Sequence, residues 1–291
     1  MKVLITGANG QLGYALQKTS EIFSSQHVLM LIALARTEMD LAQLEKITEV
    51  LDAYAPDAVI NAAAYTAVDK AEVDEASARL INVDAVQKMA RWCHANNKTF
   101  IQVSTDFVFD GEKSKPYSPN DKTNPLGIYG RTKLAGEELA LEECKNTYIV
   151  RTGWVYCEHG ANFVKTILRL AVERDQLEIV GDQIGTPTYA IHLAEILWLL
   201  LLRKPQQKIW HFSDAGVASW YDFAVAITEE AKHMGLLNKI PHIKSIATED
   251  YLTPARRPAF SVLDKKATWE ELQIIPMHWQ AALVKMLAAL K

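Results

Sequence analysis

The chain has 291 residues, of which 49% are hydrophobic and 23% charged, as expected for a globular protein with one large domain or a larger domain and a smaller one. Its net charge is −4 and its Lys and Arg residues are spread along the chain, which argues against a nucleic-acid surface. The three cysteines lack C-x-x-C spacing, which argues against a disulfide framework or a zinc site and favours a reducing cytoplasm.

Over residues 1–156, short apolar runs alternate with helical patterns, which is typical of an α/β fold with a doubly wound parallel sheet of the Rossmann type. In chain order, the apolar runs predict strands at 2–6, 27–35, 57–64, 99–109 and 147–156. The segments between them predict helices at 10–23, at 39–55 with Asp40 as the cap, at roughly 77–96 and at 129–143. We assign residues 1–156 to a cofactor-binding domain.

Beyond residue 156 the alternation loosens and prolines interrupt the segments, which predicts a smaller, mostly helical substrate lobe over residues 157–291. We expect it to pack over the carboxyl ends of the strands, with some segments free to return to the main sheet. Its most apolar stretch, at 193–202, contains Glu195 and is too short to span a bilayer, so it predicts a buried helix. The N-terminal residues lack the long apolar region of a signal peptide, and we expect no membrane partner.

Three glycines, Gly7, Gly10 and Gly13, follow the first predicted strand as G-x-x-G-x-x-G. Glycine permits a tight turn, and the missing side chains let backbone N–H groups and the helix N-terminus approach a pyrophosphate. The alternative is a close strand–helix turn without a ligand. The position inside a βαβ pattern favours a dinucleotide.

The end of the second predicted strand indicates which dinucleotide binds. An NAD site typically has an acid there for the ribose hydroxyls, whereas this strand is followed by Arg36. An Arg at this place can pair with a 2′-phosphate, so we predict NADPH, with NADH as a second cofactor left open. Asp40 and Leu41 are candidates for the adenine pocket, and the alternative for Arg36 is a solvated loop charge.

A Tyr and a Lys four residues apart lie on one helix face, where the ammonium group can lower the pKa of the phenol for proton exchange. The chain contains this pattern twice, as Tyr14–Lys18 and as Tyr129–Lys133. Tyr14 follows the glycine turn and faces the pyrophosphate end, whereas Tyr129 opens a helix after a strand that offers Thr105. We therefore predict that Tyr129 and Lys133 are catalytic and that the first pair is structural.

Seven motifs then match a known family in its own order, nearly from end to end. They are GANGQLG (7–13), DAVINAAAYTAVDKAE (57–72), INVDAV (81–86), VSTDFVFDG (103–111), YGRTKLAGE (129–137), RTGWVY (151–156) and TPARRPAFSVLD (253–264). With them the chain resembles the extended short-chain dehydrogenase/reductase family. Within it, the chain is similar to the members that reduce the C4 keto group of dTDP-4-dehydrorhamnose to dTDP-L-rhamnose. The resemblance implies a dTDP-sugar substrate and NAD(P)H.

The resemblance also implies roles for individual residues. Its cofactor contacts are Gly10, Gln11 and Leu12 at the phosphates, and Ala63, Ala64 and Thr66 on the nicotinamide side. Tyr129 would protonate the substrate oxygen, Lys133 would hold the nicotinamide ribose, and Thr105 would hydrogen-bond the reacting carbonyl. The alternative for Thr105 is a structural role, in which its hydroxyl at the strand end forms a hydrogen bond with the backbone.

For the substrate, the resemblance implies a sugar pocket and a diphosphate site. Asp106 and Trp154 would help to form the sugar pocket, and Val68 would contact the sugar. Arg256 and Arg257 suit the diphosphate, because guanidinium groups bind phosphate bidentately. The alternatives are an ordinary core aromatic for Trp154 and a solvated surface pair for the two arginines.

One departure from the family concerns metal. Known bacterial members bind magnesium through acidic residues at a dimer interface, and one of these acids lies in the helix after the glycines, where this chain has Ala15. The later segment at 185–196 has no adjacent acidic pair. We therefore predict no metal, and we leave a monomer and a homodimer both open.

Other functions remain as alternatives. A nucleotide-sugar 4,6-dehydratase needs Asp and then Glu directly after the Thr, whereas here Thr105 and Asp106 precede Phe107. A nucleotide-sugar epimerase or another reductase uses the same Tyr, Lys and hydroxyl, although the motifs at 103–111 and 253–264 are reductase-like. A non-catalytic alternative is an NADP-binding regulatory subunit that resembles the beta subunit of methionine adenosyltransferase.

Overall fold

The structure is a computed structural model that describes residues 1–24 and 29–291. The described residues form a six-stranded parallel sheet in the order β10-β5-β4-β3-β1-β2. Its strands are β1 (Lys2–Thr6), β2 (Met30–Leu34), β3 (Ala58–Asn61), β4 (Thr99–Thr105), β5 (Thr147–Thr152) and β10 (Ile209–His211). This order confirms the predicted Rossmann-type sheet.

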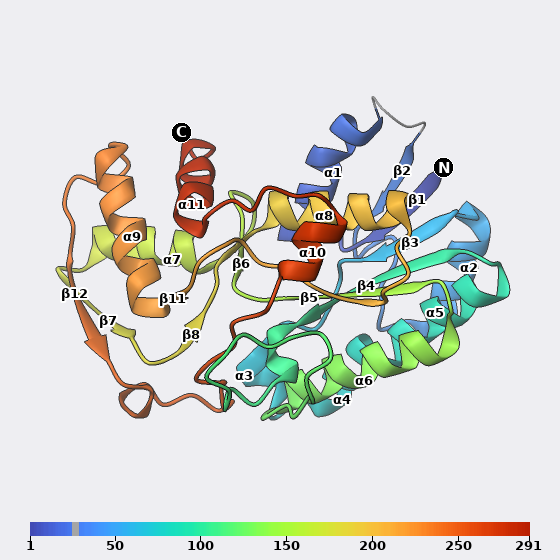
Figure 1. Ribbon diagram of the computed structural model, residues 1–291, viewed down its shortest axis with the longest axis horizontal. Helices are drawn as coiled ribbons and strands as arrows, with labels where there is room; N and C mark the ends of the chain where they lie inside the picture. Colours follow the sequence, from blue (N-terminus) through green and yellow to red (C-terminus); the bar gives the residue numbers. More distant parts are fainter. Residues whose placement is uncertain (25–28) are drawn as a thin grey trace.

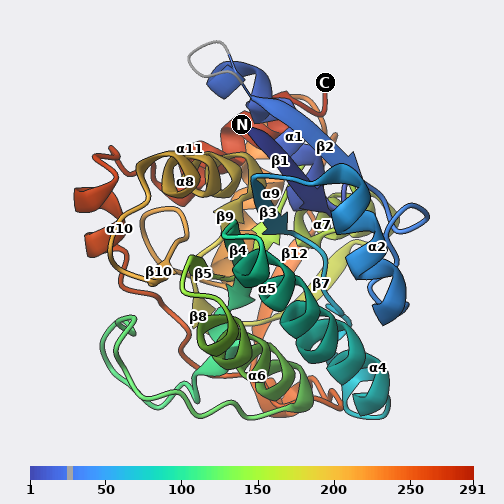
Figure 2. The same ribbon diagram turned by 90° about the vertical axis from the view of Figure 1, so that its right-hand side faces the viewer.

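Helices cover both faces of this sheet (Figures 1 and 2). On one face lie α1 (Gln11–Ser24) and α8 (Ala190–Arg203), which pack against each other; on the other lie α2 (Leu44–Tyr54), α5 (Ala85–Ala95) and α6 (Ile128–Glu143). Because both faces are covered, β1 and β3 are continuous apolar runs rather than alternating ones. The apolar stretch at 193–202 lies in α8 and is largely buried, as predicted.

The later part of the chain builds a second apolar core from α7 (Phe163–Glu173), α9 (Trp220–His233) and α11 (Trp279–Ala288). Figure 1 shows these helices to the left of the sheet. Its short strands are β6 (Val155–Tyr156), β7 (Gln176–Val180), β8 (Ile184–Gly185), β9 (Thr188–Tyr189), β11 (Ala218–Ser219) and β12 (His242–Ile246). From the same part of the chain, β10 joins the main sheet and α8 packs on one of its faces, so a boundary at residue 156 stays a prediction.

The remaining elements are short. They are α3 (Val68–Ala71), α4 (Glu75–Arg79), a π-helical turn at Leu80–Asp84, the 3₁₀ turns Asp106–Val108 and Thr248–Asp250, and α10 (Lys266–Glu271). All three cysteines are free and buried. None of the helices formed by the described residues combines the length and the hydrophobicity that crossing a bilayer requires.

Several predicted element boundaries were wrong. The second helix begins at Leu44 with Gln43 as its cap, and Asp40 instead accepts a hydrogen bond from the Ala42 N–H in the preceding turn. The strand predicted at 99–109 ends at Thr105, and the strand predicted at 57–64 ends at Asn61. In the strand predicted at 27–35, residues 27 and 28 lie outside the described residues, and β2 begins at Met30.

The strand order predicts a ligand crevice beyond the carboxyl ends of the strands. β1 has β2 on one side and β3 on the other, so the connection from β1 to β2 and the connection from β2 to β3 place their strands on opposite sides of β1. In open parallel sheets, ligands bind at such a reversal, beyond the carboxyl ends of the strands. Here those ends lead into Gly7 after β1, Ala63 after β3 and Asp106 after β4.

Candidate active site

A cavity of about 690 Å³ runs along the carboxyl ends of β1, β3 and β4. The predicted residues that line it are Gly7, Gly10, Gln11, Leu12, Ala63, Ala64, Thr66, Val68, Thr105, Asp106, Tyr129, Lys133 and Trp154. The structure therefore brings the glycine turn, the segment after β3, and the Tyr–Lys pair of α6 to one site. Gly13, Arg36, Asp40, Leu41, Arg256 and Arg257 are not among the residues that line it.

The glycine turn has the shape that a dinucleotide requires. Gly7 has φ +66°, in the left-handed region that favours glycine, and its carbonyl accepts from the Gly10 N–H at 2.9 Å. A Cβ on Gly13 would lie 2.1 Å from the Gly7 oxygen, so Gly13 is required for α1 to pack close to β1. The N-terminus of α1 then borders the cavity, where its free N–H groups suit a pyrophosphate.

The residues after β2 lie outside this cavity. Arg36 is largely exposed, with 78% of its side chain accessible, and its Nε lies 3.3 Å from an Asp40 carboxylate oxygen. Leu41 is buried in the core on the α2 side of the sheet. The role of Arg36 at a 2′-phosphate and the roles of Asp40 and Leu41 at the adenine stay predictions.

At the other end of the cavity, a strand end meets a helix start. Thr105 is the last residue of β4, and Tyr129 is the second residue of α6 (Ile128–Glu143). The Thr105 hydroxyl donates to Asp106 Oδ1 at 3.1 Å and accepts from the Phe107 N–H at 3.1 Å. It also lies close enough to the Tyr129 phenol to affect the pKa of that group. The Lys133 ammonium, one turn along α6, donates to the Val103 carbonyl at 2.7 Å.

Burial dominates the ionisation of these groups, because it disfavours every charged form. Burial raises the pKa of Tyr129 to about 12, with the Thr105 hydrogen bond lowering it and Asp106 raising it. Burial lowers the pKa of Lys133 to about 8, although the negative charge of Glu137 raises it. The net shift of the Tyr129 pKa is therefore upward, so the phenol keeps its proton at neutral pH, and the predicted effect of Lys133 on this pKa stays a prediction.

Asp106 is the third buried ionisable group. Burial raises the pKa of its carboxyl to about 6, although hydrogen bonds from Ser261 and Thr105 lower it. Ser261 belongs to the motif at 253–264, so this segment reaches the end of the cavity that contains Thr105 and Tyr129, which we call the reaction end. Ser104, in the cavity wall beside Thr105, has a buried hydroxyl without a hydrogen-bond partner among the described residues, which leaves it free for a ligand.

Behind Lys133, a buried ion pair connects α6 to β5. Glu137 lies one turn after Lys133, and its carboxylate accepts from Arg151 Nε and Nη2 at 2.7 to 3.0 Å. The two side chains are only 1% and 4% exposed. Arg151 Nη1 also reaches the Pro119 carbonyl at 3.4 Å, so this pair holds part of the loop that precedes α6.

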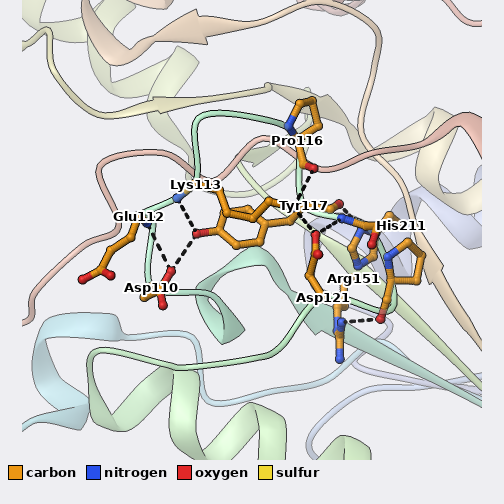
Figure 3. Close-up of polar contacts among 10 residues, drawn as sticks. Asp110, Glu112, Lys113, Pro116, Tyr117, Asp121, Arg151 and His211 are labelled. Atoms are coloured by element: carbon orange, nitrogen blue, oxygen red, sulfur yellow. Dashed lines mark hydrogen bonds and ion pairs between the residues drawn. The ribbon is translucent and has the colours of Figure 1, made fainter.

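Figure 3 shows how that loop, residues 110–127, is fixed on the sheet. The Tyr117 phenol donates to Asp110 at 2.7 Å, and the Tyr117 carbonyl accepts from His211 Nδ1 at 2.9 Å. Lys113 pairs with Asp121 inside the loop. Burial and the neighbouring Arg151 charge lower the pKa of His211 to about 3, so this histidine is neutral. Because α6 begins directly after this loop, these contacts position the first turn of α6, which contains Tyr129.

The second Tyr–Lys pair has other partners. The Tyr14 ring stacks on His159 with 4.7 Å between centroids, and Lys18 forms an ion pair with Glu158 at 2.7 Å. Neither Tyr14 nor Lys18 is among the residues that line the cavity. These contacts support the structural role predicted for the pair.

A second cavity, of about 380 Å³, lies beside the first and is largely apolar. Arg257 lines it, and Arg257 Nη2 pairs with Asp69 of α3 at 2.7 Å. Arg256 is exposed outside both cavities, which leaves Arg257 as the arginine of the predicted pair in a position to meet a ligand. Phe107, Trp154 and Trp220 line both cavities.

Some residues at the site were missed from the sequence. Phe107 and Ser261 lie inside quoted motifs, but no site role was predicted for them. Trp220 and the turn at Gly160 and Ala161 also contribute to the cavity walls, and no sequence signal identified them. Asn82 hydrogen-bonds the backbone of Tyr65 and the Thr132 hydroxyl, as expected for a structural polar residue.

Comparison with known proteins adds independent findings. Residues 1–291 match the family described as RmlD substrate binding domain. The chain is 42% identical over 287 residues to the dTDP-4-dehydrorhamnose reductase of Aggregatibacter actinomycetemcomitans, with 97% of each chain covered. The structure resembles that of a dTDP-4-dehydrorhamnose reductase from Clostridium acetobutylicum, with a TM-score of 0.91 and 35% identity over 100% of this chain and 99% of the other. It also resembles the Bacillus anthracis dTDP-4-dehydrorhamnose reductase in complex with NADP, with a TM-score of 0.90 and 31% identity over 99% of each chain.

Proposed function

Because the chain belongs to the dTDP-4-dehydrorhamnose reductases, the family of the RmlD substrate binding domain, we propose that it reduces the C4 keto group of dTDP-4-dehydrorhamnose to give dTDP-L-rhamnose. This is the last step of dTDP-rhamnose synthesis. The observation that carries the proposal is one cavity with the glycine turn at one end and Thr105, Tyr129 and Lys133 at the other. NADPH is the proposed reductant, as suggested by the relative in complex with NADP, and NADH is kept as an alternative donor.

The residues at the glycine end suit the cofactor, because Gly7 has a positive φ, a side chain at Gly13 would collide with the backbone of Gly7, and the helix N-terminus is open to the cavity. Gly10, Gln11 and Leu12 would hold the phosphates. Arg36, with Asp40 and Leu41 beside it, would meet the adenosine end. When bound, the reduced nicotinamide supplies a hydride to the sugar carbonyl carbon.

Tyr129 is the proposed proton donor. Its phenol has a pKa of about 12 because it is buried, so it carries its proton at neutral pH and can give it to the C4 oxygen as negative charge develops there. A positioned acid of this kind contributes about 10² to 10⁴ in rate. Thr105 has one hydroxyl proton, which it donates to Asp106, and a substrate oxygen would compete for that proton.

Lys133 is proposed to stabilise the phenolate that proton donation leaves behind. With a pKa of about 8, the amine is mostly protonated at neutral pH. One of its N–H groups is used by the Val103 carbonyl, so the others remain for a ribose hydroxyl and for electrostatic support of Tyr129. Asp106, with Trp154 and Val68 nearby in the cavity wall, is proposed to contact the sugar hydroxyls.

The nucleotide end of the substrate is proposed to occupy the 380 Å³ cavity. Its apolar walls suit a pyrimidine base and a deoxyribose, and Arg257 can offer two N–H groups to the diphosphate. Residues 1–156 are thus proposed as the cofactor domain and residues 157–291 as the substrate lobe, with β10 added to the sheet and α8 covering one of its faces. We further propose a cytoplasmic enzyme that acts as a monomer or homodimer.

The first experiment measures NADPH oxidation by the purified protein with dTDP-4-dehydrorhamnose generated in situ. Wild type is expected to oxidise NADPH and form dTDP-L-rhamnose. Tyr129→Phe is expected to lose at least about 100-fold in kcat, because it lacks the proton donor. The matched control Tyr14→Phe, in the other Tyr–Lys pair, is expected to keep wild-type turnover. NADPH binding without turnover by wild type would contradict the proposed function.

A further inference from the structure

The helix that carries Tyr129 begins without a cap of its own. α6 starts at Ile128, and its N-cap residue is Gly127, which has no side chain to accept a hydrogen bond from the first turn. The first N–H groups of a helix have no partners within the helix, so they need an acceptor from elsewhere. Because Tyr129 belongs to this turn, the contacts that hold the turn also set where the phenol lies.

A carboxylate from a distant segment takes the place of the cap. Glu72 Oε1 accepts from the Ile128 N–H at 2.7 Å, although the two residues are 56 positions apart in the sequence. The bond is charge-assisted, and the negative charge lies at the positive end of the α6 dipole, where it is stabilising. Glu72 is the last residue of the motif at 57–72, and no role was predicted for it.

Gly127 and this carboxylate are complementary. A Cβ on Gly127 would lie 2.6 Å from Glu72 Oε1, which is closer than real side-chain contacts, whereas the next nearest atoms outside its chain neighbours are 3.7 and 3.9 Å away. The Gly127 backbone is extended, with φ −125° and ψ 173°, so its conformation does not itself require glycine. The glycine is needed because the Glu72 carboxylate occupies the space that a side chain would fill.

Apolar contacts hold the same two segments together. Ala71 and Ile128 are buried in one small cluster, and the Tyr129 side chain packs against it. The Tyr129 ring also meets the Phe107 ring edge-on, at 5.8 Å between centroids. These neighbours hold the ring, while the Glu72 hydrogen bond holds the backbone from which the ring projects.

The segment that supplies Glu72 has an anchor of its own. α3 is too short to keep its position alone, and it is tied to the later part of the chain. Asp69 of α3 pairs with Arg257 Nη2 at 2.7 Å and accepts from the Ala255 N–H at 3.2 Å. α3 therefore links the motif at 253–264 to the start of α6, and Glu72 extends from a fixed base.

We propose that Glu72 is a positioning residue for the reduction, which caps α6 from α3 and thereby holds the Tyr129 phenol where it can protonate the substrate oxygen. This inference rests on the proposed function. A general acid must lie within hydrogen-bond reach of the atom it protonates, and a misplacement of about 1 Å can cost about 100-fold in rate. Glu72 is not among the residues that line either cavity, so it acts through Tyr129 and not by contact with the substrate.

The test measures two quantities in the full-length protein: kcat for NADPH oxidation with dTDP-4-dehydrorhamnose, and the Kd for NADPH by fluorescence titration. Glu72→Ala is expected to lose at least about tenfold in kcat and to change the Kd by less than about twofold, because the glycine turn does not depend on α3. Glu72→Gln keeps an oxygen that can accept from the Ile128 N–H, so both quantities should stay within about twofold of wild type. Glu75→Ala, at an exposed glutamate of α4, is the matched control and should behave as wild type.

Second substitutions at Gly127 test the cap itself. Once Glu72→Ala has removed the carboxylate, Gly127→Ser has room for its side chain, and a serine hydroxyl at the N-cap can accept from the first turn of α6. The double variant with Gly127→Ser is expected to recover most of the lost kcat, whereas the double variant with Gly127→Ala is not. If Glu72→Ala does not fold, the single variants at Gly127 replace it. In both, the new Cβ displaces the carboxylate, so only Gly127→Ala, which supplies no oxygen, should lose kcat.

Three results would overturn the positioning role: an equal loss of kcat in Glu72→Ala and Glu72→Gln, a parallel loss of NADPH affinity, or no recovery with Gly127→Ser. A wild type that binds NADPH without turnover would instead overturn the proposed function. In that case the midpoints of urea denaturation still test the cap, because the double variant with Gly127→Ser should be more stable than the one with Gly127→Ala. Equal midpoints would show that Glu72 does not cap α6.

Discussion

Three ionisable side chains at the reaction end of the cavity are governed more by burial than by each other. Burial holds Tyr129 as a neutral phenol, raises the pKa of Asp106 to about 6 and lowers the pKa of Lys133 to about 8. Each shift favours the uncharged form. A site of this kind keeps its proton donor protonated, and it strengthens any hydrogen bond made to a developing charge.

The raised pKa of Asp106 predicts a pH dependence of stability. The folded protein binds a proton at Asp106 up to about pH 6, whereas the ordinary carboxyl pKa is 3.8, so between these values the folded state holds more protons than the unfolded chain. The free energy of unfolding therefore falls as pH rises through this window, by an amount on the order of 2–3 kcal/mol.

Asp106→Asn removes this ionisation and keeps an oxygen that can accept from Thr105. We expect the variant to be more stable than wild type at pH 8, and the difference to vanish below about pH 4, in urea denaturation across that range. Asp182→Asn is a control, because Asp182 lies outside the cavity and the hydrogen bonds from Thr248 keep its pKa low. A constant difference between Asp106→Asn and wild type at all pH values would contradict the assignment.

At the residue scale, the sequence was sufficient where a residue type and its position along the chain both carried information. Tyr129 was distinguished from Tyr14 because Tyr14 faces the pyrophosphate end of the cofactor and a proton donor must lie near the nicotinamide. In the structure Tyr129 lines the cavity, and Tyr14 does not. Trp220 could not be identified as a cavity residue from the sequence, because its position depends on a stacking contact with Trp154 that sequence spacing does not encode. Arg256 and Arg257 were equivalent in sequence, and only the fold separates them.

At the scale of elements, the pair Glu137–Arg151 determines how α6 lies on β5. Its carboxylate and guanidinium are almost fully buried and held by several hydrogen bonds. Removal of one partner leaves an uncompensated buried charge, which costs about 3–5 kcal/mol, whereas replacement of both by apolar groups of similar volume is far less harmful.

We therefore expect Glu137→Gln to lower the free energy of unfolding by about 3–5 kcal/mol at pH 7, as measured by urea denaturation. The double variant Glu137→Leu with Arg151→Met should recover most of that loss. The exposed pair Arg169–Glu173 offers a control, and Glu173→Gln should have little effect. If the double variant is as unstable as Glu137→Gln alone, buried charge is not the cause of the instability.

Element boundaries show where sequence patterns end and tertiary contacts begin. The strand predicted at 147–156 is interrupted at Gly153 and Trp154, because Trp154 turns back to reach Trp220. The helix predicted at 77–96 starts two residues earlier and contains a π-helical turn at Leu80–Asp84, where Asn82 bonds to Tyr65 and Thr132. Hydrophobic periodicity located these elements, but contacts from other segments set their ends and irregularities.

At the scale of the whole molecule, the segment 157–162 lies over the glycine turn, although some 150 residues separate the two in sequence. Asn162 donates to the Gln11 side chain at 3.0 Å, and His159 Nε2 donates to the Asn9 carbonyl at 3.0 Å. Gly160 and Ala161 line the same cavity as Gly7 and Gly10. This contact could not be predicted from the sequence, because the glycine motif describes its own turn and not the segment that covers it.

This contact predicts that the segment 157–162 contributes to cofactor affinity. His159→Ala removes the stack on Tyr14 and the hydrogen bond to Asn9, a loss of about 1 kcal/mol of support for the turn, so the Kd for NADPH should rise about fivefold in a fluorescence titration. The affinity for dTDP-L-rhamnose should not change, because the segment lies at the opposite end of the cavity from Tyr129. His233→Ala, at an exposed histidine that ends α9, should leave both affinities as in wild type. An equal loss of both affinities in His159→Ala would mean that the segment stabilises the fold in general and does not hold the cofactor turn.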